Sequence, residues 1–460
     1  MSQINRRQAL ALALGAGLLQ ARTAVAAGAP IGSAAAASGG APLLPLHYNE
    51  NPLGPGPKAR EAMIASLGDG WRYADGEHAQ RLIAAIAAHE RVAPERIAIG
   101  SGSGELLHIL ALGWATRGSV TCAWPTFGQL MGFAEKLGAT VRRVPLDARL
   151  RHDAAAIDAA TPTGTSLVYL CNPNNPTGTV LPAAELRELC LTLAARTLVV
   201  VDEAYMDFVE PGATESMVDL ARGGADVVVL RTFSKVHGLA GLRVGYAIGR
   251  PDPIERMRSL ELVSPNMPGV VAATASLGDR EFVARTRDSV MADRRRVTAV
   301  CRELGMECSD SHGNFVYVRT GLSATDFRDR MRGFGIEVGR PFPPLTDWSR
   351  ISLGRPEDNT ALIAALRAFK AGGPARKVAA TLPEARVWSG DAAGSGVWRA
   401  PAPSVLRSHG SSRSRAPMTA HGRATSIRPN AASPICRTCS AGRSPRRRWS
   451  PPTSRVSRVS

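Results

Sequence analysis

The feature that most constrains the fold is an alternation of short apolar runs with longer amphipathic segments, which begins near Ile97. The runs are short and rich in β-branched residues, as buried strands are, and the segments between them have helical periodicity. The predicted strands cover residues 96–99, 119–124, 141–145, 166–171, 197–202 and 227–231, and the predicted helices cover 104–114, 127–137 and 182–195. This order predicts an α/β fold with a mostly parallel central sheet that has helices on both faces.

The pattern changes after Pro265 and indicates a second, smaller domain. A long charged helix is expected over 279–304, followed by an apolar run at 313–318, a helix at 324–334 and a strand at 350–353. We therefore expect a large domain over 71–265 and a small α+β domain over 266–370. The segment 45–70 is expected to pack on the small domain.

The first 26 residues have the organisation of a twin-arginine export signal. Arg6 and Arg7 precede a short apolar stretch at 9–19, and Ala24-Val25-Ala26 fits a cleavage site. The stretch is too short to span a bilayer, which takes about 20 residues. The signal predicts a periplasmic or secreted protein, with a cytoplasmic protein that has an unprocessed leader as the alternative. Residues 27–44 are predicted to be a flexible linker.

Most of the positive charge belongs to the last 90 residues. The chain has a formal charge of +17, and 371–460 holds 16 of its 56 Lys and Arg but two of its 39 acids, which leaves +3 for the rest. A balance near zero argues against a nucleic-acid surface on the folded part. The tail has no apolar periodicity, so it is predicted to be disordered. It is either a basic binding tail or the translation of a shifted reading frame.

The cysteines predict neither a disulfide framework nor a metal site. Their number is odd, seven, and their spacing is scattered. Cys436 and Cys439 have CxxC spacing, but tetrahedral zinc needs four ligands and no partner pair accompanies them. We therefore predict no metal.

Four residues near strand ends are candidates for the chemistry. Lys235 follows the apolar run 227–230, and a lysine held in a pocket can lose its proton and form a Schiff base with an aldehyde. Asp202 ends another apolar run, so its carboxylate needs a cationic partner such as a protonated pyridine nitrogen. Tyr205 and Asn175 carry hydrogen-bond donors for a phenolic oxygen on the same ring. A surface lysine, a helix cap, a core tyrosine and a turn asparagine are the plainer interpretations.

A second group of residues has the character of a phosphate site. Gly102, Ser103 and Gly104 follow a predicted strand and open a helix, which offers backbone N–H groups to an anion. Glycine-rich turns are common, so this signal is weak alone. The charged and hydroxyl contacts that would complete the site are those of Arg243, Ser234 and Thr232.

Two further residues are candidates at the ring and at the substrate. Phe127 could stack on a ring face, although a core aromatic residue is almost as good an interpretation. Arg350 opens a late apolar strand and fits a clamp on a carboxylate, with Arg355 as a competing candidate.

From about Leu46 to Lys370 the sequence resembles fold-type I aminotransferases of class I/II, and it is most similar to histidinol-phosphate aminotransferases. The segments that carry the resemblance are 49–55, 72–75, 100–105, 125–127, 172–178, 202–205, 234–235 with 241–243, 314–315 and 350–354. Ala74 stands where a proline is usual, and Phe127 where a tyrosine or tryptophan is frequent. Neither change removes a group that catalysis needs.

The resemblance implies pyridoxal 5'-phosphate as cofactor, with Lys235 as its covalent attachment point and proton carrier and Asp202 and Tyr205 as catalytic partners. It also implies a homodimer in which Tyr73 reaches the cofactor of the partner subunit. The implied substrate-binding residues are Asn51, Asn175, Asn314 and Arg350. The expected reaction moves an amino group between an L-amino acid, aromatic or similar to histidinol phosphate, and a 2-oxo acid such as 2-oxoglutarate.

Two alternatives to an aminotransferase stay open at this point. One keeps the cofactor and breaks another bond, as in a decarboxylase or a carbon–sulfur lyase. The other is a non-catalytic module that binds nucleic acid through the basic tail.

Overall fold

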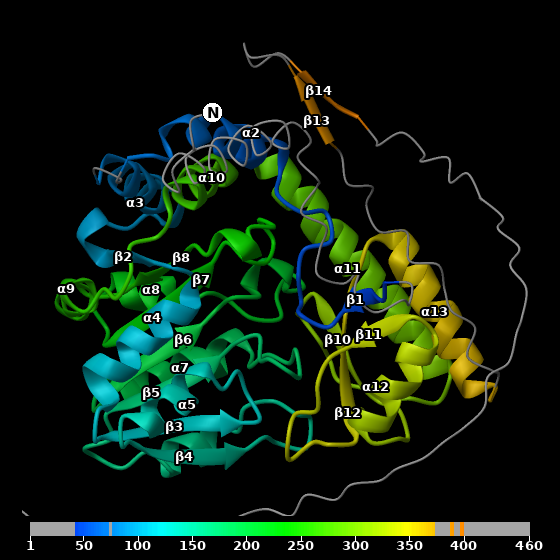
Figure 1. The fold of residues 1–460 in the computed structure, drawn as a ribbon. Coiled ribbons are helices and arrows are strands. Elements are labelled where there is room, and N and C mark those ends of the chain that lie inside the picture. Colours follow the sequence, from blue (N-terminus) through cyan, green and yellow to red (C-terminus); the bar gives the residue numbers. More distant parts are fainter. Residues whose placement is uncertain (1–41, 73–75, 373–386, 391–395, 400–460) are drawn as a thin grey trace, which may run out of the picture. The chain divides into compact units, whose positions relative to one another are not determined.

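A seven-stranded sheet forms the centre of the larger part of the fold (Figure 1). In spatial order its strands are β2 (Ile97–Gly100), β8 (Gly245–Ile248), β7 (Val227–Thr232), β6 (Leu198–Asp202), β5 (Leu167–Cys171), β3 (Ser119–Trp124) and β4 (Thr140–Pro145). β8 runs antiparallel to both of its neighbours, and the other pairs are parallel. The mostly parallel sheet predicted from the sequence is therefore confirmed.

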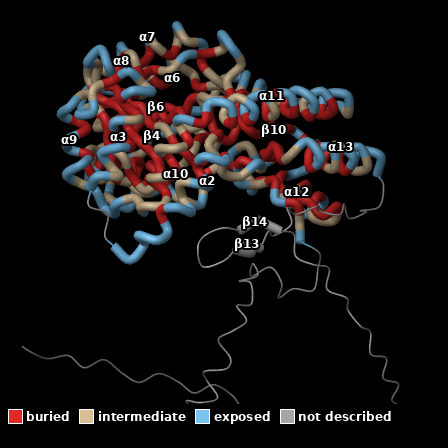
Figure 2. Tube along the Cα trace, turned by 90° about the horizontal axis from the view of Figure 1, so that it is seen from above, coloured by how far each residue is buried: buried red, intermediate tan, exposed pale blue. Residues whose placement is uncertain are grey.

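Two separate apolar cores lie on the two faces of this sheet, because successive side chains of a strand point to opposite faces. Val199 and Val201 belong to one core, and Leu198 and Val200 belong to the other. The first core is covered by α3 (Glu77–Glu90), α6 (Ala154–Ala159), α7 (Ala183–Ala194), α8 (Val218–Arg222) and α10 (Met267–Leu277). The second is covered by α4 (Ser103–Leu110), η4 (Ala111–Ala115), α5 (Gln129–Lys136) and α9 (Pro251–Ser259). Figure 2 shows buried residues concentrated in the interior of the larger part, as along β6, and exposed residues mainly at its periphery.

The smaller part of the fold combines short strands with three helices. β10 (Phe315–Arg319) lies between β12 (Trp348–Ser352) and β9 (Glu307–Cys308), and the first strand of the described chain, β1 (Leu44–Leu46), pairs in parallel with β11 (Ile336–Val338). The helices are α11 (Arg280–Glu303), α12 (Ala324–Gly333) and α13 (Pro356–Lys370). A third core joins these elements and includes Tyr205 and Val236 from the larger part.

The connecting segments complete the path of the chain. α2 (Pro57–Ser66) packs against α10, and four short 3₁₀ turns follow: η2 (Leu67–Asp69), η3 (Pro94–Arg96), η5 (Met206–Phe208) and η6 (Ala240–Leu242).

Most predicted elements differ from the observed ones by one or two residues at their ends. The helix predicted over 104–114 ends at Leu110 and continues as the π-helical turn η4, where Arg256 donates to the Gly113 carbonyl.

The computed structural model describes residues 42–72, 76–372, 387–390 and 396–399. The described residues up to Gly372 belong to one compact unit, and the antiparallel pair β13 (Val387–Gly390) and β14 (Gly396–Arg399) belongs to another. The predicted signal peptide, Tyr73, most of the linker and most of the tail lie outside the described residues. The predicted domain boundaries stay a prediction.

In the described ranges, no helix is both long enough and apolar enough to cross a membrane.

Candidate active site

A cavity of about 610 Å³ opens where β5, β6 and β7 end, and it brings most of the predicted site residues together. The predicted residues that line it are Ser103, Phe127, Asn175, Asp202, Tyr205, Thr232, Ser234, Lys235, Arg243 and Arg350. Their positions follow from the parallel sheet, because the carboxyl ends of parallel strands meet at one edge. The smaller part of the fold closes the cavity with Arg350, Phe342 and Arg340.

Lys235 is half-buried on the cavity wall, three residues beyond β7. Its Nζ donates to the carbonyls of Tyr48 at 3.3 Å and of Asn49 at 3.0 Å. Burial, together with the positive charge of Arg350, lowers the pKa of Lys235 from 10.5 to about 8. An amine with this pKa is uncharged in part of the molecules near neutral pH, and the uncharged amine is the nucleophile.

Asp202 is buried at the end of β6 and carries two hydrogen bonds. The hydroxyl of Tyr169 donates to its Oδ2 at 2.8 Å, and the backbone N–H of Ala204 donates to its Oδ1 at 3.2 Å. Burial raises the pKa of Asp202 above its ordinary value, and these two bonds offset part of that rise. A buried carboxylate of this kind is stabilised by a cation inside the cavity.

Tyr205 keeps a proton that it can donate. Its oxygen accepts from the Nδ2 of Asn49 at 3.1 Å and from the Nδ2 of Asn175 at 3.2 Å, so its lone pairs are engaged. Burial raises the pKa of Tyr205 to about 12, which keeps the phenol protonated. The hydroxyl proton is therefore left for an acceptor in the cavity.

Arg350 is a buried guanidinium set between two aromatic rings. Its two terminal nitrogens donate to Asn175 Oδ1 and to the His47 carbonyl, both at 2.6 Å. Its carbon lies 5.7 Å from the Phe315 ring centre and 4.9 Å from that of Phe342. Its Nε has no hydrogen-bond partner among the described residues, so this cation has capacity left for an anion. Arg355 does not line this cavity and instead pairs with Asp358 at the start of α13.

Another group of residues at this cavity has the features of a phosphate cradle. α4 begins after Gly102 without a side-chain cap, which leaves the helix end open to an anion. A Cβ at Gly102 would lie 2.5 Å from a terminal nitrogen of Arg243, so a side chain would fill the cradle. The Arg243 guanidinium lies 3.5 Å from Ser234 Oγ, which is also bonded to Thr232.

The donor set of the cavity fits pyridoxal phosphate. An aldehyde matches the amine of Lys235, a protonated ring nitrogen matches the carboxylate of Asp202, and a ring oxygen matches the hydroxyl of Tyr205. A phosphate matches the end of α4 with Arg243.

Four predicted residues do not line the cavity itself. Gly102 and Gly104 flank Ser103 at the start of α4. Asn51 donates to the Val236 carbonyl at 2.8 Å, and Asn314 donates to the Asn49 carbonyl at 3.0 Å, so both hold the 49–51 segment next to Lys235. Tyr73 lies outside the described residues. The roles predicted for all these side chains stay predictions.

Several neighbours of the site have little or no signal in the sequence. Asn49 lies in a segment that resembles the family but has no pattern of its own, and Tyr169 is inside a predicted strand, where a tyrosine is an ordinary core residue. His47, Arg340 and Phe342 come from segments without any motif. The period-two pattern of β5 was the one signal for Tyr169, since it puts residues 169 and 171 on the same face.

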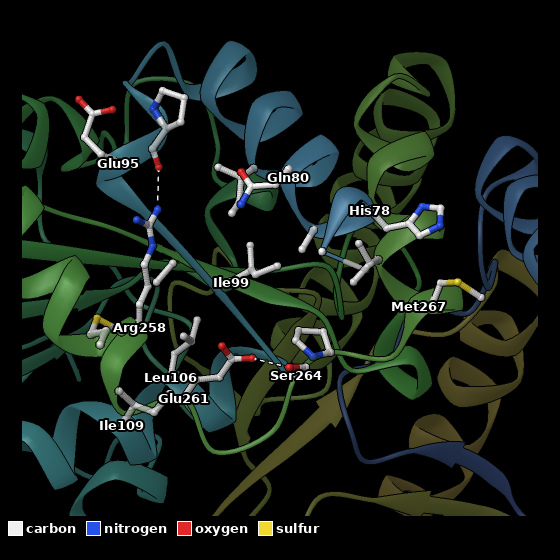
Figure 3. A pocket seen from close by; sticks show the side chains of 18 residues that line it. His78, Gln80, Glu95, Ile99, Leu106, Ile109, Arg258, Glu261, Ser264 and Met267 are labelled. Carbon is white, nitrogen blue, oxygen red and sulfur yellow. Dashed lines mark hydrogen bonds between the residues drawn. The ribbon is translucent and has the colours of Figure 1, made fainter. Parts of the chain in front are cut away.

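A second cavity, of about 630 Å³, lies elsewhere, among α3, β2, α4, α9 and the segment before α10 (Figure 3). Its wall combines polar and charged residues with apolar ones, among them Ile99, Leu106 and Ile109. Two of its charged side chains bond to the chain itself: Arg258 donates to the Pro94 carbonyl at 2.9 Å, and Glu261 accepts from Ser264 at 2.8 Å. No described lysine lines it, so the chemistry belongs to the first cavity.

Comparisons with known proteins agree with this geometry. The profile of the family "Aminotransferase class I and II" matches residues 41–366. The chain is 37% identical to "Histidinol-phosphate aminotransferase 2" of Caulobacter vibrioides over 347 residues, covering 74% of this chain and 90% of the relative. It is 40% identical to "Aromatic amino acid aminotransferase" of Mycobacteroides abscessus over 328 residues, covering 71% and 92%.

A solved structure is similar as well. The histidinol-phosphate aminotransferase of Sinorhizobium meliloti, in complex with pyridoxal-5'-phosphate, superimposes with a TM-score of 0.67 at 30% identity and covers 72% of this chain and 91% of that one. The chain belongs to the aminotransferase class I and II family, and it is a pyridoxal phosphate-dependent aminotransferase.

Proposed function

We propose that the amino donor is an L-amino acid with an aromatic or imidazole side chain, or histidinol phosphate, and that the acceptor is a 2-oxo acid such as 2-oxoglutarate. The observation that carries the proposal is the position of Arg350. This buried cation shares one cavity with Lys235 and lies between the rings of Phe315 and Phe342. A carboxylate or a phosphate would pair with the guanidinium, and a flat side chain would contact the aromatic wall.

The cofactor supplies an electron-poor ring that accepts the electrons released from the substrate Cα. Asp202 keeps a negative charge against the ring nitrogen, and Tyr205 and Asn175 orient the ring through their hydrogen-bond donors. Lys235 would hold the cofactor, and its amine, when free, would accept the proton from the substrate Cα. Arg350 fixes the substrate anion, so that the Cα proton points toward Lys235.

Reductive trapping tests the assignment of Lys235. Treatment of the cofactor-loaded protein with borohydride is expected to leave a pyridoxyl group on the peptide that contains Lys235. Lys235→Ala is expected to lower turnover by about 10⁴-fold or more, since both attachment and proton transfer are lost. Lys136→Ala, at an exposed lysine on α5, serves as the control. An unlabelled Lys235 peptide, or an active Lys235→Ala variant, would refute the proposal.

A substrate panel tests the donor and the reaction type together. Aromatic amino acids, histidine, histidinol phosphate, aspartate, alanine and cysteine are each incubated with 2-oxoglutarate, and glutamate, carbon dioxide and sulfide are measured. Glutamate without either gas is expected, with the highest kcat/KM for an aromatic or imidazole donor. A higher kcat/KM for aspartate or alanine would overturn the donor class.

We further propose that the protein is a homodimer. Large apolar side chains are exposed on the segments 67–71 and 262–263: Leu67 is 60% exposed, Trp71 81%, Leu262 50% and Val263 63%. Clustered exposed apolar residues are typical of a subunit interface. Light scattering should report a dimer, and Trp71→Glu should shift it toward monomer. Leu191→Glu, at an exposed leucine on α7, should leave the dimer intact. A monomeric wild-type protein contradicts the proposal.

We also propose that the chain is exported through the twin-arginine route, which carries folded proteins, to the periplasm or beyond. The support is the order of Arg6-Arg7, the apolar stretch 9–19 and Ala24-Val25-Ala26. Cell fractionation should find a processed chain outside the cytoplasm, and Arg6→Lys with Arg7→Lys should retain it inside. Finding only unprocessed cytoplasmic wild-type chain would rule out export.

A further inference from the structure

A buried tyrosine stands behind the carboxylate that faces the cofactor. Tyr169 lies on β5, next to β6, and it is fully buried. Its hydroxyl donates to Asp202 Oδ2 at 2.8 Å. Tyr169 is absent from the residues that line the cavity, so it reaches the cofactor only through Asp202.

The hydrogen bond from Tyr169 favours the ionised form of Asp202 in the cofactor-free protein. Burial raises the pKa of Asp202, and the bond from Tyr169 is the largest of the influences that lower it, ahead of the Ala204 N–H and the charge of Lys235. Burial and the adjacent carboxylate hold the pKa of Tyr169 well above its usual value, so the phenol stays a donor. Without that donor, Oδ2 would lose the contact that favours the ionised form.

We propose that Tyr169 is a positioning residue that orients Asp202 and keeps it ionised, ready to pair with the protonated ring nitrogen of pyridoxal phosphate. The inference rests on the cofactor already assigned to this chain. It also explains why a phenol and a carboxylate occupy adjacent buried strands. Two apolar residues could pack there without the cost of burying polar groups.

The test compares cofactor affinity in matched variants. Tyr169→Phe removes the hydroxyl and keeps the ring, and Tyr246→Phe is the control. Tyr246 is also buried and donates to a carboxylate, Glu90 Oε1, at 2.6 Å, but neither residue lines the cavity. The dissociation constant of pyridoxal phosphate is measured by titrating cofactor-free protein between pH 6 and pH 9, after circular dichroism has shown each variant to be folded.

We expect Tyr169→Phe to weaken cofactor binding about tenfold at pH 7, which is the size of effect that the loss of one hydrogen bond to a charged group produces. The ratio of variant to wild-type dissociation constants should grow as the pH falls, because the variant protonates Asp202 at a higher pH. The titration of the cofactor itself cancels in that ratio. Tyr246→Phe should change the dissociation constant less than twofold.

A double-mutant comparison separates this role from a packing defect. In an Asp202→Asn background no charge is left for Tyr169 to sustain, so Tyr169→Phe should have no further effect on affinity. An unchanged affinity in Tyr169→Phe, or an equal loss in the Asp202→Asn background, would overturn the inference. Tyr169→Met, also without a donor, replaces the first variant if that one does not fold. Failure of the wild-type protein to bind the cofactor would instead refute the assignment of the cofactor.

Discussion

The charged residues of the cavity influence one another's protonation. Lys235 and Arg350 are cations that share the cavity with the carboxylate of Asp202, and each is partly stripped of water. The positive charge of Arg350 helps to hold Lys235 in its neutral form, and the same Arg350 keeps capacity for an anion. Substrate anion binding and amine reactivity are therefore coupled, because an anion on Arg350 removes part of the field that lowers the pKa of Lys235.

Cofactor attachment should follow the titration of Lys235. Because the pKa of Lys235 is lowered to about 8, the neutral amine becomes scarcer as the pH falls below 8. The rate of covalent attachment of pyridoxal phosphate should fall about tenfold for each pH unit below 8 and level off above it. Stopped-flow absorbance measures this rate. Pyridoxamine phosphate, which has no aldehyde, is the control, and a plateau reached only near pH 10.5 would contradict the prediction.

Replacing Arg350 by lysine should weaken the binding of the substrate. Lysine keeps the charge but loses the planar pair of donors, so the KM for 2-oxoglutarate should rise about tenfold to a hundredfold. Arg319→Lys on the neighbouring strand β10 is the control, since Arg319 is exposed and pairs with Asp347. Steady-state kinetics measure the KM of both variants, and an unchanged KM in Arg350→Lys would exclude the proposed contact between Arg350 and the substrate.

Among the secondary-structure elements, the short strand β1 connects the two parts of the fold. β1 pairs with β11, and the residues just after β1 supply the carbonyls that accept from Lys235. The turn after Lys235 fits closely against this segment, because a Cβ at Gly238 would lie 1.9 Å from the Gly54 carbonyl oxygen. Gly238 also has a φ of +72°, which a side chain would strain. A three-residue strand thus sets the position of the lysine.

Weakening β1 should therefore lower both stability and cofactor affinity. Leu46 is 2% exposed, and Leu46→Ala should cost about 2–5 kcal/mol of unfolding free energy. Cofactor affinity should fall with it, since the 48–51 segment loses its anchor. Pro45→Ala on the exposed side of the same strand is the control. Urea unfolding and cofactor titration measure both effects, and a stable Leu46→Ala variant with normal affinity would show that β1 is dispensable.

The parts of the fold with a strong local pattern were predictable from the sequence. The strands that end at Asp202 and just before Lys235 are continuous apolar runs, so the sheet and the location of the site followed from one rule. Contacts between segments that are far apart in the sequence had no such local pattern. The bond from Tyr169 to Asp202 and the donation from Arg350 to His47 depend on which strands become neighbours and on how two parts of the chain meet.

The distribution of charge matters at the scale of the whole molecule. The last 90 residues carry +14 of the formal charge of +17, whereas the site lies in residues up to 372. Catalysis and any attraction to polyanions should therefore be separable properties of this chain.

A chain that ends at Gly372 should keep its turnover and cofactor affinity within about twofold. The same chain should lose any salt-sensitive binding to DNA, because that binding depends on clustered Lys and Arg. Filter binding at two salt concentrations and a standard activity assay measure the two properties on matched preparations. Loss of activity on truncation would show that the tail contributes to the folded enzyme.

The hydrogen bond between Asn49 and Ser352 joins residues 303 positions apart, and it has a consequence for synthesis on the ribosome. Asn49 emerges early, but it cannot form this hydrogen bond until Ser352 has also been translated. The segment that contacts Lys235 therefore gains this anchor late, after residue 352 has left the ribosome, although Lys235 and Asp202 emerge well before that point. Stable loading of the cofactor during synthesis should accordingly begin only when the strand that ends at Ser352 is available.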